Sequence, residues 1–311
     1  MNAREYDVIV VGGGPAGLQA TLTLGRMHRS VLMLDSGDYR NAAAGEMHNF
    51  VTRDGTPPAE FRAAGQAELR AYDTVEARNV RATEVTPDGE RWRVVLDGAD
   101  AVGARKIILA TGLRDTLPDK PGLAEMWGDV VAHCPYCHGH EFSGQHVAIL
   151  GSTPQVAKLA SLVSRIASRI TVLTDGGELD IATRKQLADA GVDVRDESVT
   201  GVRRSSAGAT VVFRGAQEEE VGGLFVTTEL SQTAPFAEQL RLEMLPSGCV
   251  RIDELGRTSQ PGIYAAGDMA HLASLPKPLA SVLSAAAAGL LAATAADQDL
   301  IVEDNGLAAT A

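Results

Sequence analysis

The sequence predicts an α/β protein, and three observations carry this prediction. Residues 6–35 and residues 145–175 each read as a strand, a helix and a second strand, the unit from which parallel sheets are built. The chain has 311 residues, of which 45% are hydrophobic, enough for two domains with substantial cores. We therefore expect two Rossmann-like, three-layer ββα nucleotide-binding domains.

The first unit contains a glycine-rich turn between a strand and a helix. The apolar run YDVIVV at 6–11 leads into GGGPAG, where Gly12, Gly14 and Gly17 satisfy G-x-G-x-x-G, and a helical pattern follows. Such glycines let the backbone approach a pyrophosphate, to which the helix N-terminus offers N–H groups. Asp35 ends the next strand, where an acid can bind ribose hydroxyls. The pattern favours a dinucleotide site over a purely structural glycine turn.

Later segments supply the remaining strands and two linkers. RWRVVLDGAD at 91–100 is a strand with an Asp-Gly turn, and ARKIILATG at 104–112 is a strand that ends in small residues. LPDKPG at 117–122 and SQTAPF at 231–236 read as breaks, the second of which returns the chain to its first domain. TSQPGIYAAGD at 258–268 is a strand that runs into a Gly-Asp turn.

The Ala-rich stretch at 279–296 is apolar and long enough to resemble a membrane span. Its Ala, Ser and Gly content suits close packing, and no Trp, Tyr or basic anchors flank it closely. We expect a buried helix there rather than a membrane segment, with disorder only after about residue 300.

Composition and charge exclude several functions. The net charge of −12 and the pI near 5.1 argue against nucleic acid as a partner. The N-terminus lacks the pattern of a signal peptide, so a cytoplasmic location is expected. Three cysteines form no secreted disulfide framework, and a close pair in a reducing compartment is more often catalytic or metal-binding.

That close pair lies in CPYCHGHE at 134–141, which admits three chemistries. Cys134, Cys137 and His138 match the C-x-x-C-H pattern of haem attachment, and the two thiols are also spaced as a redox pair. Zinc is the third reading, with His133, His138 and His140 as further ligands. Zinc needs four ligands around one ion, and no distant second pair accompanies these, so no metal site is predicted.

Four motifs occur in the order seen in low-molecular-weight thioredoxin reductases, and the chain resembles that family over nearly its whole length. They are Gly-Gly-Gly-Pro-Ala-Gly at 12–17, Ala-Thr-Gly at 110–112, Cys-Pro-Tyr-Cys at 134–137, and Thr258 with Pro-Gly-Ile-Tyr-Ala-Ala-Gly-Asp at 261–268. The resemblance implies a discontinuous FAD domain, 1–116 plus 232–311, with an inserted NAD(P)H-type domain at 117–231 that carries the C-x-x-C pair. It also implies a homodimer.

The resemblance assigns ten residues to FAD. Asp35 would bind the adenosine ribose, Asn49 would lie in a loop that contacts the flavin, and Asp268 would hydrogen-bond the ribityl chain, although an acid at that point can also be a helix N-cap. The full set is Gly12, Gly14, Gly17, Asp35, Asn49, Ala110, Thr111, Gly112, Gly267 and Asp268.

The second nucleotide fold departs from the family pattern. After Gly151, the next two fingerprint positions hold Thr153 and Val156, whose Cβ atoms would crowd a pyrophosphate. Asp175 and Glu178 stand where an NADPH enzyme has arginines, so they would repel a 2′-phosphate. An acid at 175 still leaves weak NADH use open, through the ribose 2′-hydroxyl.

These departures resemble a branch of the family, the dithiol oxidases that close disulfides in gliotoxin, holomycin and romidepsin. The resemblance implies that a small-molecule dithiol attacks Cys134, that Cys137 faces the flavin, and that electrons pass through FAD to dioxygen with release of hydrogen peroxide. His138 follows the pair where thioredoxin reductases carry Asp, and an imidazole that titrates near neutrality suits it as the acid/base.

Two other functions stay open at this point. One is a thioredoxin or disulfide reductase that takes electrons from NADH, NADPH or ferredoxin. The other is a redox sensor or metal-binding module on a flavin scaffold. His133 and His140 are secondary candidates for function, His48 has no stronger claim than any loop histidine, and Cys249 is expected to be a small buried apolar residue.

Overall fold

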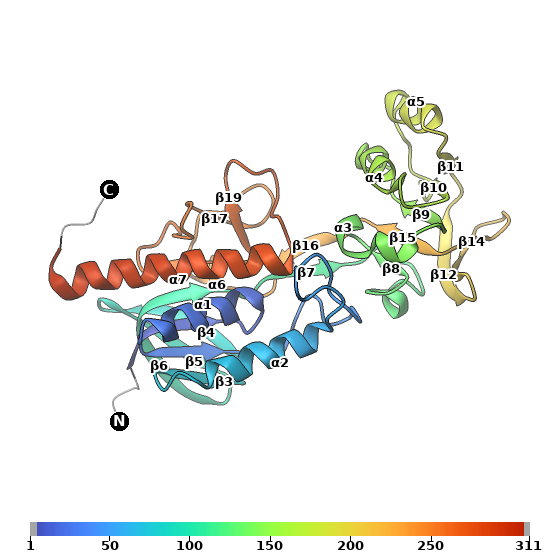
Figure 1. Cartoon of the computed structure of the whole chain (residues 1–311). Coiled ribbons are helices and arrows are strands. Elements are labelled where there is room, and N and C mark those ends of the chain that lie inside the picture. The colour runs from blue at the N-terminus through green and yellow to red at the C-terminus, as the bar shows by residue number, and fades with distance from the viewer. Residues whose placement is uncertain (1–4, 308–311) are drawn as a thin grey trace. The chain divides into compact units, whose positions relative to one another are not determined.

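The computed structural model describes residues 5–307, and the chain forms two compact units (Figure 1). The first unit comprises Met1–Ala42, Pro58–Arg114 and Leu230–Ala311, and the second comprises Ala43–Pro57 and Asp115–Glu229. The chain crosses between the units four times, and two of these crossings, at 114/115 and 229/230, lie within two residues of the expected boundaries at 116/117 and 231/232. The sequence did not suggest that segment 43–57 belongs to the second unit. It does so in the structure, where its backbone at Ala43 packs directly against Gly128.

The first unit contains a seven-stranded sheet in the order β3-β2-β1-β6-β5-β4, with β18 paired to β6. Strands β1, β2, β3, β6 and β18 pair in parallel, and β4 and β5 continue as an antiparallel extension. The strands are β1 (Glu5–Val11), β2 (Val31–Leu34), β3 (Val75–Arg78), β4 (Ala82–Asp88), β5 (Arg91–Leu96), β6 (Ala99–Leu109) and β18 (Ile263–Ala265).

Four helices, one of them short, and two short strands accompany this sheet. They are α1 (Pro15–Arg26), α2 (Pro58–Leu69) and α7 (Val282–Asn305), with the short α6 (Phe236–Gln239), and the parallel pair β17 (Val250–Ile252) and β19 (Ala270–Leu272). Helix α7 lies along α1 (Figure 1). A Cβ on Gly289 would lie 2.1 Å from the carbonyl oxygen of Ala16, so the small residues of α7 allow the two backbones to approach closely.

Helix α7 continues nine residues beyond the predicted end at 296. It ends where Gly306 adopts the left-handed conformation, with φ of 58°, and caps its last carbonyls. The expectation of disorder after about residue 300 is therefore wrong up to Asn305. Among the described residues, α7 is the one helix with the length and hydropathy of a membrane span, and half of its most apolar stretch is buried against the rest of the chain.

The second unit repeats the nucleotide-binding architecture on a smaller scale. Its parallel sheet has the order β11-β10-β9-β15-β8, beside an antiparallel sheet β12-β13-β14. The elements are β8 (Val131–Ala132), α3 (Pro135–His138), β9 (His146–Leu150), α4 (Gln155–Val163), β10 (Arg169–Leu173), α5 (Ile181–Asp189), β11 (Asp193–Arg195), β12 (Val199–Ser205), β13 (Gly208–Phe213), β14 (Glu219–Val221) and β15 (Gly223–Val226).

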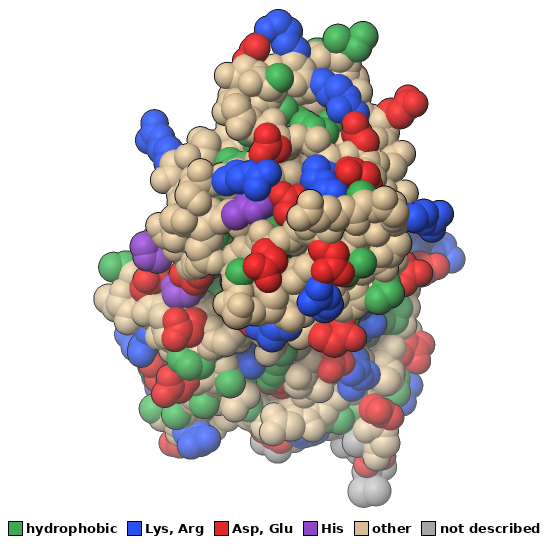
Figure 2. Space-filling model, turned by 90° about the vertical axis from the view of Figure 1, so that its right-hand side faces the viewer, with side chains coloured by type: hydrophobic (Ala, Val, Ile, Leu, Met, Phe, Trp, Pro, Cys, Tyr) green, Lys and Arg blue, Asp and Glu red, His purple; other side chains and the backbone are tan. Residues whose placement is uncertain are grey.

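Single helical turns and a strand pair fill the connections. The 3₁₀ turns Ala124–Met126 and His140–Phe142 flank β8 and α3, and the strands that contain the crossings at 114/115 and 229/230, β7 (Leu113–Thr116) and β16 (Glu229–Gln232), pair with each other. The α/β class with two Rossmann-type sheets is thus confirmed. On the face shown in Figure 2, acidic and basic side chains are interspersed.

Candidate functional site

The glycine-rich turn of the first unit is shaped by close backbone contacts. Gly12 has φ of 124°, donates its N–H to the carbonyl of Leu34 at 2.8 Å, and would place a Cβ only 2.2 Å from the carbonyl oxygen of Ala110. A Cβ on Gly17 would lie 1.8 Å from the oxygen of Gly12, so two of the three fingerprint positions require glycine. Gly14 is different: it is the N-cap of α1, and nothing lies within 4 Å of its Cβ position. Open space therefore adjoins the start of α1, where a diphosphate would bind.

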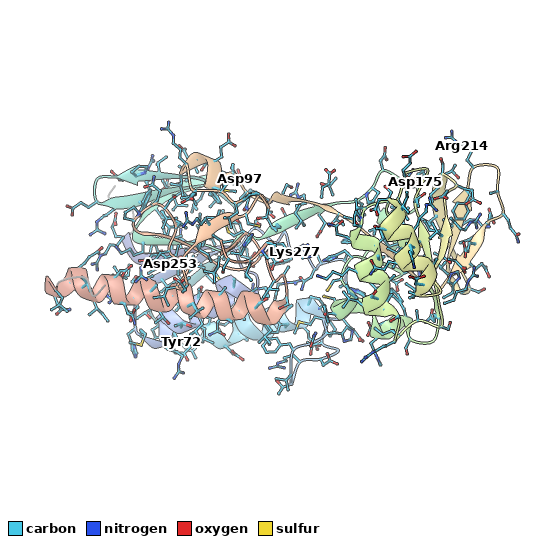
Figure 3. The ribbon with its side chains drawn as sticks, turned by 90° about the horizontal axis from the view of Figure 1, so that it is seen from above. Tyr72, Asp97, Asp175, Arg214, Asp253 and Lys277 are labelled. Carbon is cyan, nitrogen blue, oxygen red and sulfur yellow. The ribbon has the colours of Figure 1, made fainter. Side chains whose placement is uncertain are left out.

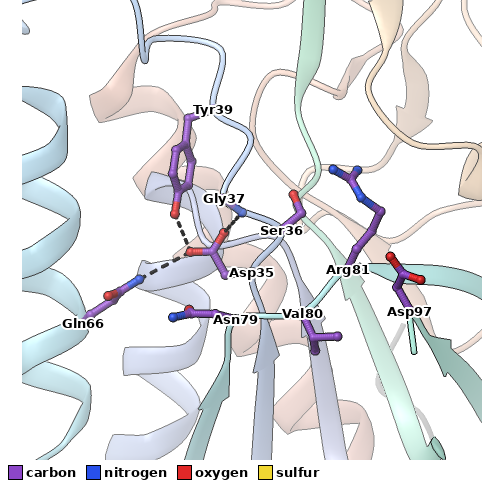
Figure 4. A pocket seen from close by; sticks show the side chains of 9 residues that line it. All are labelled: Asp35, Ser36, Gly37, Tyr39, Gln66, Asn79, Val80, Arg81 and Asp97. Carbon is purple, nitrogen blue, oxygen red and sulfur yellow. Dashed lines mark hydrogen bonds between the residues drawn. The ribbon is translucent and has the colours of Figure 1, made fainter. Parts of the chain in front are cut away.

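Asp35 is buried at the end of β2 and is held by three hydrogen bonds (Figure 4). Its Oδ1 accepts from the N–H of Gly37 at 2.9 Å, and its Oδ2 accepts from the Tyr39 hydroxyl at 2.5 Å and the Gln66 amide at 3.3 Å. Burial, together with this carboxylate, raises the pKa of Tyr39 to about 12. A carboxylate offers about four acceptor positions, so this fixed geometry still accommodates a ribose hydroxyl.

Asp35 lines an open cavity of about 670 Å³ in the first unit. The other side chains around it come from the loop after β2, from α2 and from the ends of strands (Figure 4). They are Ser36, Tyr39, Gln66, Asn79, Val80, Arg81 and Asp97, with Gly37. The cavity is large enough for an adenosine, whose usual position beside such an acid it matches.

The Gly267–Asp268 turn lies beside the first turn of α1. Gly267 has φ of 78°, and its Cβ position is 3.0 Å from the Cβ of Ala16. Asp268 accepts a hydrogen bond from Nη1 of Arg40 at 2.8 Å, and the chain continues into strand β19. Because no helix begins there, the N-cap interpretation of Asp268 is wrong.

The remaining predicted flavin residues fall in two places. Ala110 donates to the carbonyl of Val11 at 2.8 Å, Thr111 donates its hydroxyl to the sulfur of Met269 at 3.4 Å, and Gly112 has φ of 70°. These three residues follow β6 at its carboxyl end. Asn49 lies instead in the 43–57 segment of the second unit, in the left-handed conformation with φ of 66°.

The C-x-x-C pair occupies one helical turn in the second unit. Cys134 is the N-cap of α3, and its carbonyl accepts from the N–H groups of Cys137 and His138, each at 3.1 Å. Residues three apart on a helix face the same side, so the two thiol side chains are neighbours. Both cysteines are half-buried, whereas Tyr136 between them is 67% exposed. A Cβ on Gly139 would lie 2.3 Å from the carbonyl of Pro135, which fixes a glycine directly after His138.

The histidines around the pair differ in their surroundings. His138 is half-buried, and its Nε2 lies 3.2 Å from the carbonyl oxygen of Gly128, so this nitrogen carries the proton and Nδ1 is the acceptor of the neutral ring. His133 is exposed and stacks on Trp127, with ring centroids 5.4 Å apart. His140 is exposed. Within residues 5–307, no three His, Cys, Asp or Glu side chains are grouped to hold a metal ion.

His48 has a surrounding that the sequence did not reveal. Its Nε2 lies 3.5 Å from Glu141 and 3.8 Å from Glu46, and its Nδ1 lies 3.5 Å from Asp54. Glu141 ends the CPYCHGHE motif, so a side-chain contact joins the 43–57 segment to the redox motif within the second unit. Only the tertiary structure shows this contact, because His48 and Glu141 are nearly a hundred positions apart in the sequence.

The nucleotide turn of the second unit matches the first in its backbone. Gly151 donates to the carbonyl of Leu173 at 2.9 Å, as Gly12 does to Leu34. The residue after each second strand also matches: Asp35 donates to the carbonyl of Arg78 and Thr174 to that of Arg195, both at 2.9 Å. Thr174, and not Asp175, therefore occupies the position of the ribose-binding acid.

Asp175, labelled in Figure 3, makes contacts within the second unit. It has φ of 57°, its Oδ1 accepts from the N–H of Val199 at 2.8 Å, and its Oδ2 pairs with Nζ of Lys120 at 2.6 Å. Both oxygens are engaged within the second unit. Asp175 therefore lies one residue past the position of the ribose-binding acid, which corrects the expectation that it could hold an NADH ribose.

Side chains also stand close to the glycines of the second unit's nucleotide turn and of the loop after β10. Val156 is buried, and its Cγ1 lies 3.3 Å from the Cβ position of Gly151. The hydroxyl of Ser152 lies 2.4 Å from the Cβ position of Gly177, in space that a side chain there would need. Helix α4 begins four residues after Gly151, whereas α1 begins three residues after Gly12. The close turn-to-helix approach of the first unit is therefore absent from the second.

Cys249 lies apart from the redox pair, in the first unit. It is fully buried, as expected, and burial raises the pKa of its thiol. Its sulfur lies 3.7 Å from the carbonyl oxygen of Asp268.

Comparison with known proteins extends these observations. Residues 6–293 match the family described as pyridine nucleotide-disulphide oxidoreductase. The chain is 32% identical over 320 residues to thioredoxin reductase tcpT of Claviceps purpurea, with 96% of each chain covered, and 33% identical over 306 residues to thioredoxin reductase sirT of Leptosphaeria maculans, with 92% of each covered. The solved structure of HlmI is 33% identical, with a TM-score of 0.89, and covers 97% of this chain and 94% of its own. A putative thioredoxin reductase TrxB from Bacillus anthracis is 29% identical, with the same TM-score and coverage of 96% and 99%.

Proposed function

The chain belongs to the pyridine nucleotide-disulphide oxidoreductase family as a thioredoxin-reductase-like, FAD-binding enzyme, and from this premise we propose that it oxidises a small-molecule dithiol to a disulfide. Dioxygen is the proposed electron acceptor, with hydrogen peroxide as the product. The enzyme is proposed to act in the cytoplasm.

One observation carries this proposal: the second nucleotide turn lacks the glycines and the acid of the first. Thr153 and Val156 stand at two of its fingerprint positions, and the position of the ribose acid holds Thr174. An enzyme without this entry for electrons needs another donor, and a dithiol that reacts at the C-x-x-C pair supplies one. The resemblance to the disulfide-forming oxidases of gliotoxin, holomycin and romidepsin points in the same direction.

The first unit offers a site that fits FAD. The space beside Gly14 and the N-terminus of α1 would hold the diphosphate, Asp35 and its cavity the adenosine, and Asp268 with Gly267 the ribityl chain. Ala110, Thr111 and Gly112 at the carboxyl end of β6 complete this set. When bound, FAD accepts an electron pair from the reduced cysteines and delivers it to dioxygen.

The cysteines exchange a disulfide bond with the substrate. In the proposed cycle the resting enzyme holds Cys134 and Cys137 as a disulfide; a substrate thiolate attacks Sγ of Cys134, the Cys134–Cys137 bond breaks, and Cys137 leaves as a thiolate. The second substrate thiolate then attacks the substrate sulfur of the mixed disulfide and releases Cys134. The substrate has lost two electrons as a new disulfide, and the cysteine pair has gained them as a dithiol. His138, whose Nε2 is anchored at Gly128, takes a substrate thiol proton on Nδ1 and passes it on.

Anaerobic stopped-flow spectroscopy of the purified holoenzyme tests the direction of electron flow. We expect a small dithiol such as dithiothreitol to bleach the flavin, NADPH and NADH to leave it yellow, and air to restore the colour with about one peroxide per dithiol, since each transfers an electron pair. Cys137→Ser is the matched control and should hold FAD that a dithiol no longer reduces. Rapid bleaching by NADPH, NADH or reduced ferredoxin would instead identify a disulfide reductase.

A homodimer is proposed as well, with α7 as part of its interface. Large apolar side chains on the α7 face away from α1 are 39–48% exposed in the single chain. These are Leu283, Leu290, Leu291 and Ile301. A second copy of the chain that covers this face would remove them from water.

A further inference from the structure

We propose that Arg40 binds the diphosphate of FAD, and that Asp268 holds its guanidinium in place for that contact. This inference rests on FAD binding, a property of the family, and is independent of whether a dithiol is the substrate. Arg40 lies in the loop after β2, outside every motif that the sequence suggested.

Two contacts place Arg40 near the start of α1. Its Nη1 donates to Oδ2 of Asp268 at 2.8 Å, and both side chains are largely enclosed, with 16% and 20% exposure. A Cβ built on the neighbouring Gly267 would lie 3.0 Å from the Cβ of Ala16 in the first turn of α1, so this backbone passes close to that turn. The guanidinium is thus anchored to Asp268, the residue next to Gly267, and Gly267 lies beside the helix turn that would face the diphosphate. A held arginine has already lost much of the side-chain freedom that binding would otherwise remove.

Charge explains why a cation is needed at this point. Two carboxylates, Asp35 and Asp268, flank the glycine-rich turn, and Gly13 has its Cβ position 2.1 Å from Oδ2 of Asp35. A helix N-terminus offers a partial charge of only about +0.5, which does not balance a diphosphate beside two acids. Arginine matches phosphate oxygens with parallel N–H groups, and its charge persists at any physiological pH.

Arg62, another cation of this region, is used differently. Its guanidinium lies 3.8 Å over the ring of Tyr39, and its Nη1 donates to the side chain of Asn41 at 3.2 Å. Tyr39 in turn donates to Asp35, so Arg62 supports the adenosine end of the site. Arg40 is the cation that the structure assigns to the diphosphate.

Flavin binding by the full-length chain tests this assignment. FAD is removed from the holoenzyme and rebound, with flavin fluorescence and absorbance as readouts. Arg40→Gln should raise the Kd for FAD by about tenfold to a hundredfold, the usual loss for a hydrogen bond to a charged group. Arg40→Lys should recover part of this loss, and added salt should narrow the gap between Arg40→Gln and the unchanged chain.

Arg29→Gln is the matched control. Arg29 has the same enclosure as Arg40, with 15% exposure, and pairs with Asp297 at 2.7 Å, but it follows the opposite end of α1. Its removal should lower stability without changing the Kd for FAD by more than about twofold. Equal weakening in Arg29→Gln and Arg40→Gln would show a general structural effect and overturn the proposal.

ADP identifies the part of FAD that Arg40 contacts, because it contains the diphosphate and no flavin or ribityl chain. We expect Arg40→Gln to weaken ADP, measured as a competitor of FAD, by about the same factor as FAD itself. Weakening of FAD alone would mean that Arg40 acts on the ribityl chain through Asp268, which contradicts a diphosphate contact. Unchanged affinity for both ligands would also overturn it.

Discussion

Asp35 and Thr174 occupy the same position in two copies of one fold. Each is the first residue after the second parallel strand, and each donates its N–H to an arginine carbonyl, of Arg78 or Arg195, at 2.9 Å. One copy carries a carboxylate at this position and the other a hydroxyl. The nearby Asp175 does not stand at this position, because it is one residue further along the chain and its carboxylate is held by the N–H of Val199 and by Lys120.

Repair of the second glycine turn should therefore fail to restore use of pyridine nucleotides. Thr153→Gly with Val156→Ala returns the turn toward the fingerprint, but the position of Thr174 still lacks an acid and Ser152 still fills the space beside Gly177. We expect anaerobic spectra of this double variant to show no flavin bleaching by NADH or NADPH. Bleaching by either nucleotide would mean that the turn alone blocks the site.

The glycines of the first turn should differ sharply in their tolerance of alanine. Gly17→Ala places a Cβ 1.8 Å from the carbonyl of Gly12, a backbone clash that we expect to cost about 3–5 kcal/mol and to yield little folded protein. Gly14→Ala meets nothing within 4 Å and has an ordinary φ of −76°, so it should fold normally. Its methyl group enters the space beside the diphosphate and should weaken FAD binding. Circular dichroism and flavin content separate the two results; normal flavin content in Gly14→Ala would contradict this use of the space.

The first nucleotide site could be predicted from sequence because its chemistry is local. Gly12, Gly17 and Asp35 lie within one strand-helix-strand unit, where spacing alone indicates the geometry. The assignment of Asp175 failed because TVLTD does not show which residue follows the strand; only the pairing of Leu150 with Leu173 places Thr174 there.

Other parts of the site depend on contacts between distant segments. His48 meets Glu141, and Arg40 meets Asp268, across nearly a hundred residues or more. In neither pair does the local sequence around one residue indicate the other residue as its partner. A helix was predicted where α7 lies, but its predicted end came too early. Gln298 and Asp299 resemble a polar helix end, whereas the buried Leu300 shows that the helix continues.

His138 should be required for turnover and not for flavin binding. His138→Ala is expected to lower kcat by about a hundredfold or more, the usual contribution of an acid/base, with FAD content unchanged. His138→Gln is the informative control, because its amide can still donate to the carbonyl of Gly128 but cannot move a proton. Recovery of turnover in the glutamine variant would show that His138 acts through its hydrogen bond to Gly128 and not as an acid/base.

His146 should make the second unit less stable in mild acid. Burial lowers the pKa of its imidazole below the ordinary 6.5, although the Glu220 carbonyl at 3.0 Å and Glu219 at 3.5 Å act in the opposite direction. As the pH falls below 6.5, the unfolded chain takes up a proton that the folded chain does not, so the free energy of unfolding decreases until the folded pKa is reached. His146→Gln should flatten this dependence in urea unfolding between pH 5 and pH 8. An unchanged slope would assign the acid sensitivity to other groups.

Helix α7 gives the last prediction, on assembly. Leu290 is 44% exposed in the single chain, on the face away from α1, and an aspartate there would be buried without a partner in a dimer interface. We expect light scattering to show a dimer for the unchanged chain and a shift toward monomer for Leu290→Asp, with the flavin retained because α7 contacts α1 through its other face. Gln217→Asp is the control for added charge, since it adds the same charge at an exposed polar position in the loop between β13 and β14 of the second unit and should leave the dimer intact. A Leu290→Asp protein that stays dimeric at low micromolar concentration would move the interface away from α7.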